Sequence, residues 1–169
     1  MPETAEQYIK RILGHMEGKD AMKSQAAAPR KFERLIRGVP KSRLMRKPAP
    51  GKWSVGEILA HLSDTELVVG YRIRKILENN GTSIEAYDQD RWAAEGSYGK
   101  RDPRVSLAPF TALRESNLRL LRSLSKEQWQ RYGMHAERGK ESVETILRMA
   151  AGHDLNHIEQ VERILGRKR

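Results

Sequence analysis

Apolar residues recur every three or four positions along most of this chain, which is the spacing of a helix that turns one face toward a core. The pattern covers residues 3–16, 20–39, 54–79, 106–124 and 142–165. The alternation typical of a half-buried strand appears nowhere, and no internal repeat is present. Long amphipathic segments joined by connections of unequal length predict an all-α protein, and specifically a four-helix bundle.

Polar residues mark the expected helix starts. Ser54 and Glu57 form a capping box, and Trp53 is placed to pack against Ile58 as a hydrophobic staple. Pro29 either starts a new helix as its first residue or kinks an existing one. The expected N-caps of three further helices are Asp20, Ser106 and Ser142.

Two stretches of the chain interrupt the helical pattern. Residues 82–103 are polar and rich in aromatic side chains, with a short helix expected at 88–92. A long connection of this kind is suited to cover a site rather than to build the core. Residues 131–140 are expected to form a loop, after one short helical turn at 125–129.

The composition narrows the class of protein. A chain of 169 residues is expected to form a single domain, spanning 1–169. The absence of cysteine excludes disulfides, thiolate ligands and a cysteine nucleophile, and it favours a cytoplasmic location. The start is acidic and no apolar run reaches the roughly 18 residues of a membrane span, so we expect neither a signal peptide nor a membrane protein. The net charge of +10 fits either an anionic partner or simple solubility.

Histidines interrupt two of the apolar helical faces. His153 and His157 lie one helical turn apart, in the same inward row as Ile146 and Val161. Burying two imidazoles is costly unless their nitrogens are bound, and a metal ion binds them directly. His61 lies at the edge of the apolar face of 54–79. A lone histidine there is more often a satisfied core residue, but the other pair makes it a candidate third ligand. The remaining histidines, His15 and His135, are expected at the surface.

Two motifs together carry a family resemblance. Residues 53–66 read Trp-Ser-Val-Gly-Glu-Ile-Leu-Ala-His-Leu-Ser-Asp-Thr-Glu, and residues 152–157 read Gly-His-Asp-Leu-Asn-His. In this order and separation they resemble the DinB-like (YfiT-like) metalloenzymes, and the resemblance spans nearly the whole chain. It implies a bundle of up-down-down-up topology that holds one divalent metal ion through His61, His153 and His157. The ion is commonly nickel or zinc, with iron and manganese as alternatives, and some relatives are transferases or isomerases that use a low-molecular-weight thiol.

Three neutral imidazoles leave at least one coordination position open, as in catalytic sites. An ion in such a site acidifies bound water and deprotonates a bound thiol, so we expect a metal-dependent transferase or hydrolase that acts on a small molecule. Glu57 and Asp64, on either side of His61, and Asn156, between the paired histidines, are candidate helpers. Each of these residues also has a simpler explanation. Glu57 belongs to the capping box, Asp64 is expected to be exposed to solvent, and Asn156 is expected to point outward.

Two other functions stay open at this level. The basic charge could serve nucleic-acid binding, and the histidines would then be ordinary core residues. Two observations make this function less favoured: acidic residues are interleaved with basic ones along most helices, and no nucleic-acid recognition motif is present. A noncatalytic bundle stabilised by its metal, or an interaction protein, would also fit. The oligomeric state also stays open, with a homodimer as one alternative.

Overall fold

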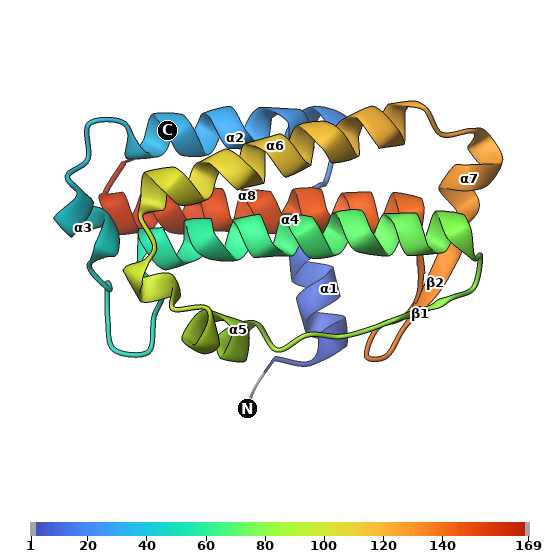
Figure 1. Cartoon of the computed structure of the whole chain (residues 1–169), viewed down its shortest axis with the longest axis horizontal. Coiled ribbons are helices and arrows are strands. Elements are labelled where there is room, and N and C mark those ends of the chain that lie inside the picture. The colour runs from blue at the N-terminus through green and yellow to red at the C-terminus, as the bar shows by residue number, and fades with distance from the viewer. Residues whose placement is uncertain (1–2, 168–169) are drawn as a thin grey trace.

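The structure, a computed structural model, describes residues 3–167. The α1 helix (Ala5–Gly14) lies across a bundle of four long helices and packs against the last of them (Figure 1). The first and last of the four run in one direction and the middle two in the other, so the predicted up-down-down-up bundle is confirmed. The four helices are α2 (Ala21–Ile36), α4 (Val55–Glu78), α6 (Pro103–Arg122) and α8 (Val143–Leu165).

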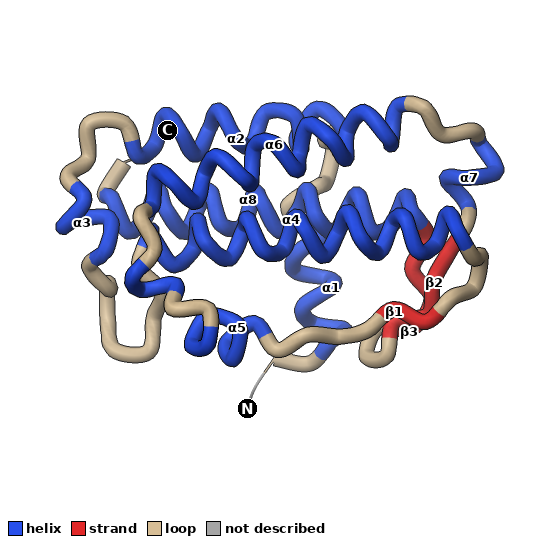
Figure 2. Tube along the Cα trace, in the orientation of Figure 1, coloured by secondary structure: helices blue, strands red, loops and turns tan. Residues whose placement is uncertain are grey.

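A crossover runs the length of the bundle, because α4 and α6 point the same way and the chain must return between them (Figure 2). This crossover, residues 79–102, contains β1 (Ser83–Ile84), α5 (Gln89–Glu95) and the 3-10 helix η1 (Tyr98–Lys100). The shorter connections contain α3 (Lys41–Met45) and α7 (Lys126–Gln130). The short helices expected at 88–92 and 125–129 are therefore confirmed.

A small sheet corrects the expectation that the chain has no strand. Residues 131–140, predicted as a loop, mostly belong to a hairpin of β2 (Tyr132–His135) and β3 (Gly139–Ser142). β1 adds to the hairpin in parallel, with Ser83 opposite Met134. Strands of two to four residues are too short to show a period of two, so the alternation test could not detect them.

Most of the predicted helix starts are confirmed. Ser54 forms its capping box with Glu57, and Asp20 and Ser142 cap α2 and α8. The N-cap predicted at Ser106 is wrong, because α6 begins one turn earlier, with Asp102 as its cap and a proline in its first turn. Proline is favoured there because its missing N–H needs no partner.

The interior contains two apolar clusters with buried polar groups between them along the helices. One cluster includes Phe32, Leu59 and Phe110, and the other includes Ile73 and Leu121. None of the helices formed by residues 3–167 is long and apolar enough to cross a lipid bilayer.

A buried guanidinium joins the four long helices. Arg114 of α6, only 2% exposed, lies 2.8 Å from Glu66 of α4 and 2.7 Å from Asp154 of α8. Its Nη1 also donates to the backbone carbonyl of Gln25 in α2. Pro29, four residues further on inside the continuous α2, has no N–H for that carbonyl, so Arg114 takes the place of the missing helical donor.

The charges of this network are mutually dependent. Burial alone would lower the pKa of Arg114, but Asp154 and Glu66 together raise it. Burial raises the pKa of Asp154 to about 6, against the opposing pull of Arg114. Asn117 donates to a carboxylate oxygen of Glu66, and the bare Cα of Gly70 leaves room for the Asn117 amide.

α1 docks where α8 has a glycine. A Cβ at Gly152 would overlap the backbone carbonyl of Ile12, so only glycine permits this close approach. The contact fixes α1 beside His153, the next residue of α8.

Replacing Arg114 with methionine should destabilise the fold by about 3–5 kcal/mol, because two buried carboxylates lose their cation. The matched control is Arg148→Met on the exposed face of α8, which should change stability by no more than about 0.5 kcal/mol. Urea unfolding followed by circular dichroism measures both. A loss below about 1 kcal/mol for the Arg114 variant would show that the network does not hold the helices together.

Candidate metal centre

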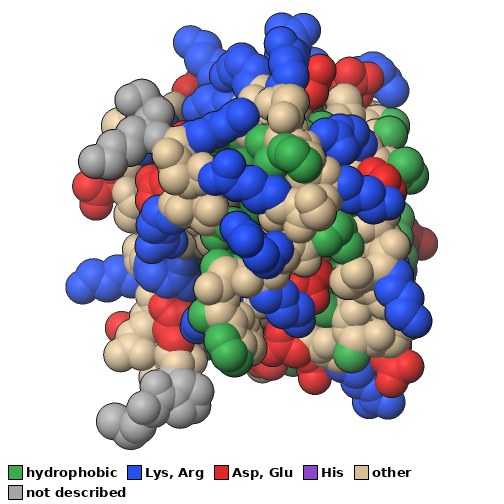
Figure 3. Space-filling model, turned by 90° about the vertical axis from the view of Figure 1, so that its left-hand side faces the viewer, with side chains coloured by type: hydrophobic (Ala, Val, Ile, Leu, Met, Phe, Trp, Pro, Cys, Tyr) green, Lys and Arg blue, Asp and Glu red, His purple; other side chains and the backbone are tan. Residues whose placement is uncertain are grey.

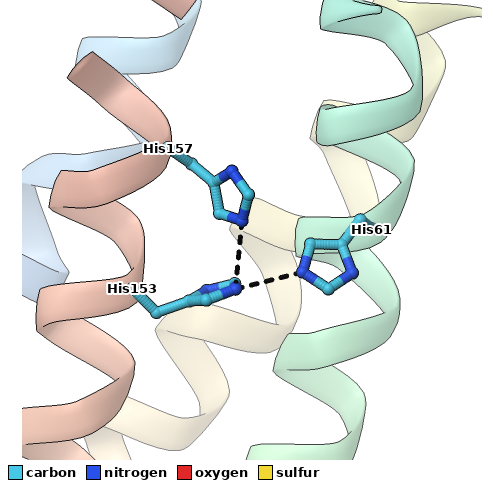
Figure 4. Close-up of side chains that lie close together, drawn as sticks. All are labelled: His61, His153 and His157. Atoms are coloured by element: carbon cyan, nitrogen blue, oxygen red, sulfur yellow. Dashed lines mark hydrogen bonds between the residues drawn. The ribbon is translucent and has the colours of Figure 1, made fainter. Parts of the chain in front are cut away.

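Three histidines converge at the interface of α4 and α8 (Figure 4). His153 and His157 project from successive turns of α8, and His61 projects from α4. The Nε2 atom of His153 lies 3.0 Å from that of His61 and 3.1 Å from that of His157. The structure therefore brings together all three predicted ligands, from positions 92 residues apart in the chain.

The spacing of these nitrogens fits a shared cation. Metal–nitrogen bonds of about 2.0–2.1 Å, at angles from octahedral to tetrahedral, place neighbouring nitrogens about 2.9–3.4 Å apart. Hydrogen bonds alone satisfy the cluster poorly, because a neutral imidazole nitrogen offers either one N–H or one lone pair. A divalent ion would accept a lone pair from each ring, so the residues present fit such an ion.

The three rings are in the neutral form that binds metal. His61 is 1% exposed, and burial, followed by the neighbouring His157, lowers its pKa to about 3. Burial likewise lowers the pKa of His157 to about 4, and it lowers the pKa of His153 together with the two adjacent imidazoles. At neutral pH all three side chains can donate lone pairs.

Neighbouring side chains orient two of the three rings. The Nδ1 atom of His157 lies 2.9 Å from Oε1 of Gln160, which accepts its proton and leaves the Nε2 lone pair free for a cation. Trp53 packs against the ring of His61, with centroids 4.9 Å apart. The predicted role of Trp53 as a helix staple did not indicate this second contact.

Two cavities meet at His153. The larger has a volume of about 590 Å³ and lies between α4, α8, the crossover and the hairpin; the smaller, of about 400 Å³, lies between α1, α8 and residues 51–53. His153 and Tyr8 line both cavities, and His157 lines the smaller one. The histidine cluster is therefore accessible to small molecules from two sides.

The crossover walls the larger cavity, as its composition suggested. Tyr87 lines it and packs against Trp92, with ring centroids 4.7 Å apart. The hydroxyl of Tyr87 is also hydrogen-bonded to Thr65 of α4, one turn beyond His61. This bond anchors the crossover over the histidines.

The three candidate helpers lie in different environments. Asn156 lines the smaller cavity and accepts a hydrogen bond from Arg11. Glu57 is buried, and burial alone would raise its pKa. The hydrogen bonds from Ser54 and the ion pair with Lys47 outweigh this effect and lower the pKa, so Glu57 is an ionised capping residue. Asp64, for which solvent exposure was the simpler explanation, instead accepts bonds from Tyr98 and Arg101 of the crossover.

The remaining histidines differ from each other. His15 is partly exposed and lies 3.5 Å from Glu159, which agrees in part with the predicted surface position. The same prediction for His135 is wrong, because pairing of β2 with both other strands buries it to 3% exposure. Its Nδ1 accepts a backbone N–H, while its Nε2 has no partner within the described residues. An unsatisfied buried N–H costs about 1–3 kcal/mol.

The profile of the DinB superfamily matches residues 26–161. Two relatives share the name "Putative metal-dependent hydrolase". OB0782 of Oceanobacillus iheyensis is 27% identical over 118 residues, which cover 70% of this chain and 68% of the relative. YfiT of Bacillus subtilis is 27% identical over 135 residues, which cover 79% of this chain and 75% of the relative.

A solved structure of YfiT is similar throughout, with a TM-score of 0.79 at 23% identity over 98% of this chain and 91% of the other. It is described as a probable metal-dependent hydrolase with an unusual four-helix bundle topology. At this identity the likeness establishes the shared fold, while the profile covers both histidine motifs. The chain belongs to the DinB superfamily.

Proposed function

We propose that this protein is a metal-dependent enzyme that acts on a small molecule. It binds one divalent ion through the Nε2 atoms of His61, His153 and His157. The observation that carries the proposal is the convergence of these nitrogens where two cavities meet. The names of the relatives, metal-dependent hydrolases, agree with this general class.

Three neutral ligands leave the ion its full charge and an open position. A divalent ion held there supplies Lewis acidity, which lowers the pKa of water toward about 7 and deprotonates a thiol outright. Imidazole ligands suit zinc, nickel and iron, whereas manganese prefers oxygen ligands. The donor set therefore fits the first three of the four ions expected from the family resemblance.

The chain's own residues position the reactants. Gln160 and Trp53 hold the rings of His157 and His61 in place. Tyr87, bonded to Thr65, forms part of the wall of the larger cavity and fixes the crossover beside the histidines.

The two cavities favour a reaction with two reactants. A hydrolase needs room for one substrate and a water molecule, whereas a transferase needs room for two organic molecules at one ion. Cavities of about 590 and 400 Å³ that share His153 fit the second arrangement. With no cysteine in the chain, a thiol nucleophile would enter as a cosubstrate.

Some of the basic side chains bind the protein's own backbone, which weakens the nucleic-acid alternative. Figure 3 views the end of the bundle that carries α3, where lysine and arginine side chains are spread among other residues. Three arginines of the chain bond to backbone carbonyls near the ends of α2 and α8, where cations are favoured by the helix dipole. They are Arg43, Arg104 and Arg167.

Replacing His153 or His157 with alanine should abolish stoichiometric metal, because two imidazoles rarely retain an ion that three hold. The matched control is His15→Ala, which removes a partly exposed histidine outside the cluster and should leave metal content unchanged. Elemental analysis of purified protein measures the content. Wild-type occupancy in both single variants would show that the ligands are assigned wrongly.

Stripping the metal should lower the melting temperature while leaving most of the helical circular dichroism at 25 °C. The physical reason is that two apolar clusters and the Arg114 network hold the bundle independently of the ion, unlike a zinc finger. Thermal melts with and without a chelator provide the measurement. Loss of most of the helical signal on chelation would make the site structural instead.

Small thiols should produce a thiolate-to-metal charge-transfer band in the cobalt-substituted protein, because an accessible open position admits a thiol and deprotonates it. Metal-dependent turnover of small electrophiles should accompany the band. The control is the His153→Ala variant, which should show neither. A cobalt spectrum unchanged by thiols and by anions that replace water would exclude an open position, and with it the enzyme.

A further inference from the structure

The larger cavity extends well beyond the histidines. It begins at His153 and follows α4 past Thr65 and Val69 to Arg72. Thr65 and Arg72, the outermost lining residues of α4, are seven positions apart, which corresponds to about 10 Å of helix. The cavity therefore extends along α4 as a channel, with His153 of the histidine cluster at one end.

The middle of this channel is apolar. Val69 of α4 faces Ile146, Met149 and Ala150 of α8 across it, and the three α8 residues are buried against the bundle. Such a lining favours a hydrocarbon segment of a ligand over a polar one.

The far end contains a guanidinium without an ion pair in the part of the chain that the structure describes. Arg72 donates to the backbone carbonyl of Glu85 and lies over the ring of Tyr87, but no carboxylate of the described residues forms an ion pair with it. Arg138, the second guanidinium at this end, has its charge matched by Glu141, at 2.7 Å. Burial and the charge of Arg138 lower the pKa of Arg72, which indicates that its charge is poorly compensated.

A second donor at this end also lacks a partner. His135 lines the same cavity, and its Nδ1 accepts the backbone N–H of Glu137, so its proton is on Nε2. That Nε2 is buried and has no hydrogen-bond acceptor within residues 3–167. An acceptor supplied by a ligand would satisfy it.

Most acidic groups around the channel are already engaged. Glu141 binds Arg138, Glu3 binds Arg11, and Asp88 caps α5. Glu141 and, less strongly, Glu137 on the exposed turn of the hairpin are the negative charges that act on Arg72. Glu137 has no ion pair of its own among residues 3–167, so its removal should strengthen anion binding at Arg72 without freeing Arg138.

We propose that Arg72 and His135 form a subsite for the anionic end of an elongated ligand, a carboxylate or a phosphate, whose apolar middle lies along Val69 and Ile146. Only the other end of the ligand, which reaches the histidine cluster, rests on the proposed function. The substrate class is thus an amphiphilic small molecule with its reactive group and its negative charge at opposite ends.

The test compares mercaptohexanoate with mercaptohexanol in the cobalt-loaded protein, using titration of the charge-transfer band. Both compounds carry the same thiol, so their difference in affinity reports the far end alone. The acid should bind at least about tenfold more tightly than the alcohol, because its carboxylate gains charge-assisted hydrogen bonds. This advantage should disappear in Arg72→Gln, remain partly in Arg72→Lys, and increase in Glu137→Gln.

The matched control is Arg148→Gln, which removes an exposed positive charge from α8 and should preserve the advantage. Circular dichroism establishes that each variant is folded. Equal affinities of acid and alcohol in the wild type, or an advantage that survives Arg72→Gln, would overturn the proposal.

A second measurement separates this subsite from the metal site. Hexanoate, hexyl phosphate and hexanol, which lack a thiol, are titrated into the zinc-loaded protein, and NMR follows the side-chain signals of Arg72 and His135. Shifts with hexanoate or hexyl phosphate, and not with hexanol, support the subsite and identify the anion. If neither mercaptohexanol nor anions that replace water change the cobalt spectrum while these shifts occur, the proposed function fails and the anion subsite stands. If neither anion shifts either signal, the subsite falls.

Discussion

The buried guanidinium of Arg114 is the constraint on which the arrangement of helices depends. It contacts α2, α4 and α8 from α6, so any displacement of one helix leaves a charge or a carbonyl without a partner. On α8 its partner is Asp154, directly after His153, and adjacent side chains on a helix point about 100° apart. Holding Asp154 toward Arg114 therefore sets the rotation of α8 that directs His153 and His157 toward His61. Stability and the geometry of the site share one set of contacts.

The topology of the bundle also explains why a cavity lies beside the histidines. Because α4 and α6 are parallel, the chain needs a connection as long as the bundle, and this connection lies over the α4 and α8 side. It brings Tyr87 to Thr65 and Tyr98 to Asp64, two anchors on the helix that carries His61. An antiparallel hairpin of helices would need no such connection and would not place Tyr87 and Tyr98 against α4.

Sequence patterns predicted what depends on local physics and missed what depends on pairing across the fold. The amphipathic period and the capping residues predicted the helices. The two histidine motifs predicted the histidine cluster and the family of the protein. Glu66 and Arg114 could not be recognised as buried, because a charged residue on a helix is usually solvated and only its partners on other helices explain its burial. The sequence does not distinguish Gln160 from other polar residues on α8, and only the structure shows its hydrogen bond to His157. The burial of His135 depends on strand pairing, which strands this short do not reveal in the sequence.

The distance between the two halves of the histidine cluster along the chain has a consequence for synthesis in the cell. His61 and His153 are separated by 92 residues, and α8 packs beside α2, which precedes both motifs. Contacts between such distant segments form late, because they must first overcome the entropy of closing a long loop. A nascent chain emerging from the ribosome thus carries a single histidine of the cluster until α8 has been made, and the three come together only when α8 has docked. Under the proposed function, capture of the ion would mark completed folding, and partly synthesised chains would lack the full set of ligands.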